Sequence, residues 1–196
     1  MNTKTILSII GITLANITST TTYAIGTNSE NKGADITLVT ATTKQWQAGR
    51  IVSMAEIKKN GLEHYFCKRN INNPIFARIY GKSYKTNCTL PRTELRYLQL
   101  LHYTVDGRIM TGEMICHKDI ANDLIEIFRK LYDAHYPIER MQLIDDFGAD
   151  DVTSMNNNNT SCFNYRAVAG SKKLSKHSMG KAVDINPLYN PYVKHR

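Results

Sequence analysis

The chain has 196 residues, a length that predicts one domain with a buried core. Hydrophobic residues make up 42% and charged residues 21%, which excludes a collagen-like, coiled-coil or wholly disordered chain. Lysine and arginine number 25 against 17 acidic residues, so the net charge of +8 favours an anionic partner: nucleic acid, acidic lipid or a cell-wall polymer.

Residues 1–24 have the layout of a secretory signal peptide. Lys4 precedes the apolar stretch Ile6–Leu14, and Thr22-Tyr23-Ala24 ends in the small residues of a cleavage site. A buried N-terminal helix is the alternative, but the intervening Ser/Thr-rich segment is a poor helix former. The stretch is shorter than the ~20 residues that span a bilayer. We therefore expect a secreted or periplasmic protein of the cell envelope, with residues 25–45 as a flexible leader and no transmembrane segment after signal removal.

The first half of the remaining chain carries two short predicted elements and one hairpin. Ile51–Lys59 is predicted as a helix, and the apolar run Pro74–Tyr80 as a strand. Leu95–Val105 and Arg108–Cys116 flank Asp106-Gly107, which predicts a β-hairpin closed by a type I′ turn.

The second half begins with the clearest helix. Ile120, Leu124, Ile127, Phe128 and Leu131 recur at helical spacing, with Asp119 as the expected cap and Pro137 as the stop. The remaining predictions are strands at Met141–Ile144 and Cys162–Arg166, separated by a loop over residues 149–161. This order of elements predicts an α+β domain with a mostly antiparallel sheet and a few helices.

Four cysteines, at positions 67, 88, 116 and 162, allow three complete disulfide pairings. None forms a CxxC, so the clustered-thiolate zinc pattern is absent. Cys67–Cys88 is the preferred pairing in an exported chain, and buried free thiols are the alternative.

The stretch Leu174–Asn186, LSKHSMGKAVDIN, holds the candidate site. A neutral imidazole at His177 and a carboxylate at Asp184 are both good zinc ligands. On one straight strand they would lie roughly 20 Å apart, so a reversal is needed between them, and Gly180 can adopt the positive φ of such a turn. Ala182–Ile185 is predicted as an alternating strand, and Ser175 could orient a ligand by a hydrogen bond. A structural His–Asp pair, hydrogen-bonded within a turn, is the alternative.

This stretch resembles a known family. Ser175-Lys-His177-Ser-Met-Gly180-Lys-Ala182-Val-Asp184 matches every fixed position of the SxHxxGxAxD signature of the M15 zinc peptidases, the DD-peptidase/hedgehog-like group. The blocks GEMIC, DIANDLIEIF, LIDDFGADD and NNTSCFNYR are also similar to one bacterial branch, so the resemblance spans about residues 90–196. It implies a hedgehog/DD-peptidase-like domain over residues 46–196, with Zn²⁺ held by His177 and Asp184. It also implies that Arg166 could stabilise the oxyanion of the scissile carbonyl; a surface salt bridge is the alternative for this arginine.

The chain departs from the family downstream of the motif. The family's third ligand is a histidine with an acidic general base three residues before it, whereas His195 is preceded by Tyr192 at that spacing. We expect either a domain that lacks its C-terminal part or a degenerate member, with weak metal binding and little hydrolysis.

The resemblance therefore implies an exported zinc-dependent peptidase, a D-Ala-D-Ala carboxypeptidase or related endopeptidase. Its partners would be the stem peptides of peptidoglycan. The alternative is a non-catalytic cell-wall-binding module that retains the fold. A nucleic-acid partner is disfavoured because the basic residues are scattered without a stacking motif. Nothing in the sequence indicates an oligomeric state.

Overall fold

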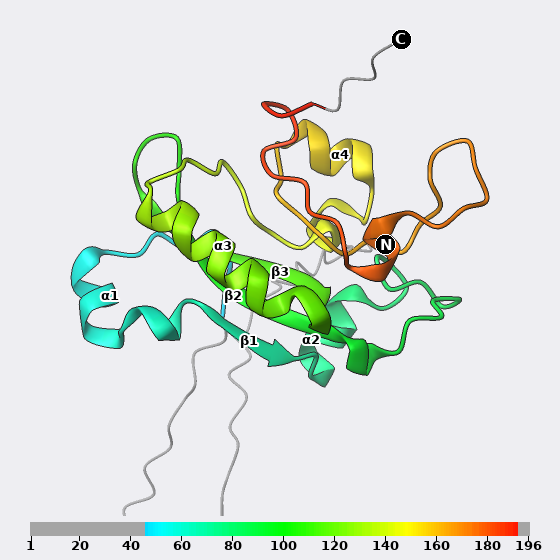
Figure 1. Ribbon diagram of the computed structural model, residues 1–196, viewed down its shortest axis with the longest axis horizontal. Coiled ribbons are helices and arrows are strands. Elements are labelled where there is room, and N and C mark those ends of the chain that lie inside the picture. Colours follow the sequence, from blue (N-terminus) through cyan, green and yellow to red (C-terminus); the bar gives the residue numbers. More distant parts are fainter. Residues whose placement is uncertain (1–45, 192–196) are drawn as a thin grey trace, which may run out of the picture. The chain divides into compact units, whose positions relative to one another are not determined.

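The computed structural model describes residues 46–191 (Figure 1). The predicted signal peptide (1–24) and leader (25–45) lie outside the described residues, as does His195. The helices are α1 (Met54–Asn60), α2 (Asn73–Ile79), α3 (Ala121–Asp133) and α4 (Asp151–Asn156), and the strands are β1 (Cys67–Asn70), β2 (Leu95–Tyr103) and β3 (Ile109–His117). Short 3₁₀ helices occupy Leu62–His64, Arg92–Glu94, Lys118–Ile120, Ile144–Phe147 and Lys176–Met179. No helix of the described residues is long and apolar enough to cross a membrane.

The centre of the domain is an antiparallel sheet in the order β1-β2-β3, which confirms the α+β prediction. Leu98 pairs with Met114 in the register of β2 and β3, and both side chains are fully buried. Helix α3 lies over this sheet (Figure 1) and packs Leu124 and Phe128 into the core, while Ile127 is turned outward and 44% exposed.

The predicted hairpin is confirmed, but the predicted type I′ turn is wrong. Of Asp106 and Gly107 only the glycine has a positive φ, of 78°, and Thr104 N–H donates to the Arg108 carbonyl at 2.8 Å. A three-residue loop over 105–107 with a left-handed glycine therefore replaces the two-residue type I′ turn.

Helix α3 is confirmed, but it does not begin at the predicted cap. Asp119 lies inside the 3₁₀ helix Lys118–Ile120, whose first N–H groups are capped by the His117 side chain: its Nδ1 accepts from Asp119 N–H at 3.2 Å. The helix ends at Asp133, before the left-handed His135 (φ 52°) and ahead of Pro137.

Two predictions were wrong because a local helix cap outweighed the pattern of the residues that follow it. The expected strand Pro74–Tyr80 is helix α2: Asn72 caps it by accepting from Ile75 N–H at 3.0 Å, and Pro74 fits the first turn. The expected loop at 149–161 contains α4, which Asp150 caps through Thr153 N–H at 2.8 Å. The predicted first helix, by contrast, is present as α1.

The strands predicted at Met141–Ile144 and Cys162–Arg166 are not strands: residues 141–143 and 162–166 are segments without regular structure that flank the outer edge of β3, and Ile144 begins a 3₁₀ helix. Glu113 N–H donates to the Met141 carbonyl at 3.0 Å, and Phe163 N–H donates to the Ile115 carbonyl at 3.1 Å. These single hydrogen bonds cover the edge of β3 without extending the ladder of the sheet.

All four cysteines are free thiols in the structure, which therefore does not contain the preferred Cys67–Cys88 pairing. The Cys67 thiol donates to Gln99 Oε1 at 3.1 Å, whereas the Cys88 thiol faces the Leu90 carbonyl at 3.9 Å. The two thiols therefore contact different residues rather than one another.

Candidate functional site

The structure brings His177 and Asp184 together. His177 lies in the 3₁₀ helix Lys176–Met179, which ends at Gly180 in the left-handed conformation with φ 62°. The chain then reverses, and Asp184 Oδ2 comes to 3.3 Å from His177 Nε2. The imidazole is largely buried, at 14% exposure, and the carboxylate is 48% exposed. The pair is therefore anchored at its base and open to solvent on the side of Asp184.

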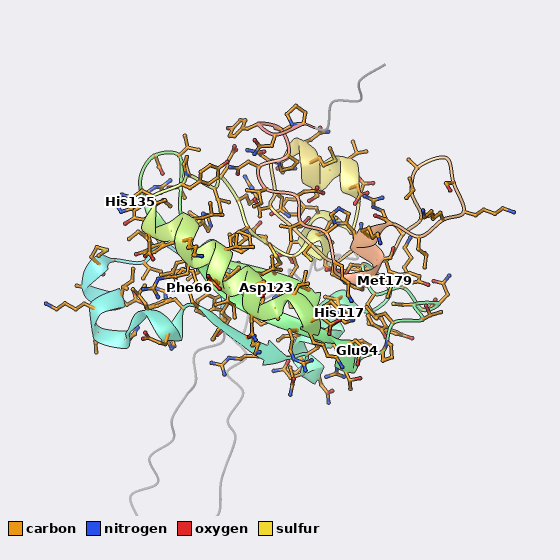
Figure 2. The ribbon with its side chains drawn as sticks, viewed as in Figure 1. Phe66, Glu94, His117, Asp123, His135 and Met179 are labelled. Atoms are coloured by element: carbon orange, nitrogen blue, oxygen red, sulfur yellow. The ribbon has the colours of Figure 1, made fainter. Side chains whose placement is uncertain are left out.

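Gly180 is required at this reversal for two reasons. Its positive φ is disfavoured for residues with a side chain. In addition, a Cβ at this position would lie 2.7 Å from His117 N and 3.1 Å from the Cys116 carbonyl carbon. The Gly180 carbonyl accepts His117 N–H at 2.9 Å, which ties the turn to the end of β3. Glu94, His117 and Met179 lie at this same end of the sheet (Figure 2).

The orientation of the His177 ring follows from one backbone contact. Its Nδ1 lies 2.7 Å from the Cys162 carbonyl. A carbonyl oxygen only accepts hydrogen bonds, so Nδ1 carries a proton and Nε2 is the ring nitrogen that faces Asp184. An imidazole nitrogen and a carboxylate oxygen that face each other at 3.3 Å have either a proton or a cation between them. The distance therefore accommodates both the predicted metal ligands and the alternative of a structural His–Asp pair.

Asp184 is positioned through its backbone rather than by a strand. It exchanges two hydrogen bonds with Ser161, at 3.1 and 3.0 Å, in an isolated bridge. The predicted strand over 182–185 is therefore wrong beyond this bridge, and Val183 and Ile185 are half-buried rather than fixed in the core. The bridge nonetheless holds the Asp184 backbone beside the segment that carries Cys162.

Ser175 and Arg166 both lie beside the 3₁₀ helix Lys176–Met179. Ser175 Oγ accepts His177 N–H at 3.3 Å and so caps the turn through its backbone rather than through the imidazole. Arg166 N–H donates to Ser178 Oγ at 2.8 Å, but its guanidinium forms an ion pair with Asp151 of α4. The arginine is thus near the turn by its backbone, while its charge is committed to a carboxylate.

Other charged side chains have hydrogen-bond or ion-pair partners away from the His177–Asp184 pair. Asp145 is buried and accepts from both Ser83 N–H (2.9 Å) and Ser83 Oγ (2.8 Å). Arg78 binds the fully buried Glu113 through two hydrogen bonds, at 2.9 and 2.5 Å, and reaches Asp146 at 3.3 Å. Asp145 and Asp146 thus have partners of their own and are not part of the candidate site.

The ligand set is limited to two residues in the part of the chain that the structure describes. Across residues 46–191 no group of three His, Cys, Asp or Glu side chains could hold a metal ion. A hollow of about 620 Å³ is lined by His102, Glu139 and Tyr189 among others, and it includes neither His177 nor Asp184. The candidate site is therefore the open His177–Asp184 pair.

The comparison with protein families bears on this same stretch. Residues 169–196 match the family model described as D-alanyl-D-alanine carboxypeptidase. The match covers the His177–Asp184 motif and supports the M15 peptidase family, and with it a peptidase of the D-Ala-D-Ala carboxypeptidase type at the family level. The comparisons with curated proteins and with solved structures found no match.

Sequence reasoning anticipated the meeting of His177 and Asp184 but missed the Cys162 carbonyl that orients the ring. A backbone carbonyl leaves no mark in the residue type, so no sequence signal could have identified it. The alternative for Arg166, a salt bridge, is what the structure shows, but its partner Asp151 was not predicted because a loop was expected over residues 149–161.

Proposed function

We propose that this protein is an exported zinc metallopeptidase that hydrolyses peptide bonds in the stem peptides of peptidoglycan. The observation that carries the proposal is the 3.3 Å approach of His177 Nε2 and Asp184 Oδ2 inside the stretch that matches the carboxypeptidase family. The net charge of +8 supports an anionic cell-wall substrate. The signal-like N-terminus supports export to the periplasm or the outside of the cell.

The donor pair fits a zinc ion. Two ligand atoms that are each about 2.0–2.2 Å from a tetrahedral zinc lie about 3.3–3.6 Å from one another. The observed separation of 3.3 Å falls in this range. The hydrogen bond from Nδ1 to the Cys162 carbonyl also matches the way proteins orient a ligating histidine. His177 and Asp184 are therefore the residues that would hold the ion.

A bound zinc ion would polarise the scissile carbonyl and make its coordinated water acidic. The chain's own residues position the two ligands. The Cys162 carbonyl orients the His177 ring through Nδ1, and Ser161 holds the backbone of Asp184. Arg166 could stabilise the oxyanion only after its guanidinium exchanges Asp151 for substrate. Residues 46–191 supply two ligands, so we expect weak zinc binding and slow hydrolysis.

A second function, a non-catalytic cell-wall-binding module, is favoured by two observations. Arg166 is already neutralised by Asp151, and among the described residues the pair lacks a third ligand. Such a module would need the basic surface but not the His177–Asp184 pair.

Digestion of purified peptidoglycan with and without zinc tests both functions. Mass spectrometry would measure released D-Ala and dipeptides, and sedimentation would measure protein bound to the cell-wall material. Slow, zinc-dependent release that is lost in Asp184→Asn supports the peptidase. Retention on the wall without release, unchanged in Asp184→Asn, supports the module. The absence of both release and retention would overturn both.

A further inference from the structure

Cys116 and Cys162 belong to segments 46 positions apart, yet the fold places them side by side. Cys116 is on β3 and fully buried, and Cys162, on the irregular segment along the edge of β3, is 2% exposed. Phe163 N–H donates to the Ile115 carbonyl at 3.1 Å, just before Cys116. The contact on the other side of Cys116 runs through Gly180.

The Gly180 carbonyl accepts both His117 N–H at 2.9 Å and the Cys162 thiol at 3.3 Å. Cys162 is therefore linked to both neighbours of Cys116: to Ile115 through Phe163, and to His117 through the Gly180 carbonyl. The hydrogen bond from Phe163 N–H to the Ile115 carbonyl makes Cys162 the neighbour of Cys116 across the two segments. A disulfide requires Cα atoms about 4.4–6.8 Å apart, a spacing that only neighbouring segments provide.

We propose that Cys116 and Cys162 are the disulfide-forming pair of this protein. Each thiol loses one proton and one electron, and an Sγ–Sγ bond replaces the two S–H bonds. A low-molecular-weight disulfide such as oxidised glutathione accepts the two electrons and two protons and becomes two thiols. This inference does not depend on the proposed peptidase activity.

The surroundings of the two thiols indicate when the bond forms. Both thiols are buried, and burial raises the pKa of Cys116 to about 12. Because the thiolate is the attacking species and buried sulfurs are shielded from reagents, the folded thiols react slowly. The bond therefore forms while the chain folds, and once formed it resists external reductants.

The cross-link also acts on the candidate site. Cys162 contributes the carbonyl that orients His177, so the disulfide would fix this carbonyl to β3. Closing a loop of this length restricts the unfolded chain, and we expect the midpoint of thermal unfolding to rise by about 10 °C.

Refolding of matched variants tests the pairing. Cys67→Ser/Cys88→Ser retains only the proposed pair, and Cys116→Ser/Cys162→Ser is its control. Each variant is reduced, unfolded, refolded in a mixture of reduced and oxidised glutathione, and alkylated in denaturant. We expect the first variant to take up no alkyl group and to weigh two hydrogens less than its reduced form. We expect the control to be alkylated, or to carry glutathione, at Cys67 and Cys88.

The full wild-type chain provides a readout that does not rely on variant folding. After the same refolding, a non-reducing tryptic digest should contain one cross-linked species that joins peptides 109–118 and 141–166. Two alkylated cysteines at 116 and 162, or glutathione on both, in protein with native circular dichroism would overturn the proposal. A predominant link from either cysteine to 67 or 88 would also overturn it.

Discussion

Replacement of Gly180 by alanine tests how the reversal holds the candidate site. A residue with a Cβ pays about 1–2 kcal/mol for the left-handed conformation that Gly180 adopts at φ 62°. The new methyl group would also lie 2.7 Å from His117 N and 3.1 Å from the Cys116 carbonyl carbon. These are backbone atoms of β3, so relief requires a shift of the turn, at a further cost of about 1–3 kcal/mol. We expect Gly180→Ala to lower the free energy of unfolding by about 2–5 kcal/mol in urea denaturation.

Gly170→Ala is the matched control for this measurement. Gly170 has a similar φ of 72°, but a Cβ there would meet nothing within 4 Å. It should therefore lose only the conformational part, about 1–2 kcal/mol. Equal losses in the two variants would refute the reasoning that the Gly180 turn is packed against β3.

Three further predictions concern stability away from the turn. Burial lowers the pKa of His102, whose neutral ring lies 2.8 Å from the Ile138 carbonyl through Nδ1. As the pH falls, the unfolded chain takes up this proton before the folded chain does. The free energy of unfolding should therefore be highest above pH 6.5 and decrease as the pH falls below 6.5. His102→Gln should flatten this fall in denaturation curves measured between pH 5 and 7, and an unchanged slope would contradict the assignment. Arg78→Met leaves the Glu113 carboxylate buried without its cation and should cost about 3–5 kcal/mol in urea denaturation, whereas a loss below 1 kcal/mol would show that the Glu113 carboxylate does not depend on Arg78. Tyr97→Phe removes only the hydroxyl that donates to Glu113 and should cost about 1.5–3 kcal/mol, clearly less than Arg78→Met in the same assay.

The fold was predictable where a pattern was long and had one reading. The hairpin of β2 and β3 combines two nine-residue apolar strands with a glycine at the turn. Helix α3 has thirteen residues with a clear apolar face. Helix α2 was not predictable from its apolar residues, because seven positions cannot separate a strand from a helix, and the cap at Asn72 decided the outcome.

The candidate site was predictable in its local part only. The return of the chain from His177 to Asp184 depends on Gly180, which lies between them in the sequence. The remaining partners come from distant segments: the Cys162 carbonyl holds His177, and Asp151 of α4 pairs with Arg166. Such contacts depend on how irregular segments pack along β3, which residue type and spacing do not reveal.

The central claim, that His177 and Asp184 share one divalent cation, is tested most directly by zinc titration followed through the imidazole nitrogen signals of the full chain. The account predicts that zinc shifts the Nε2 signal of His177 while Nδ1 stays protonated and bonded to the Cys162 carbonyl. The Asp184→Asn variant should lose this shift, and the ring of His64 provides the control signal in the same spectra. A His177 signal that does not respond to zinc, or a response that is unchanged in Asp184→Asn, would contradict the claim.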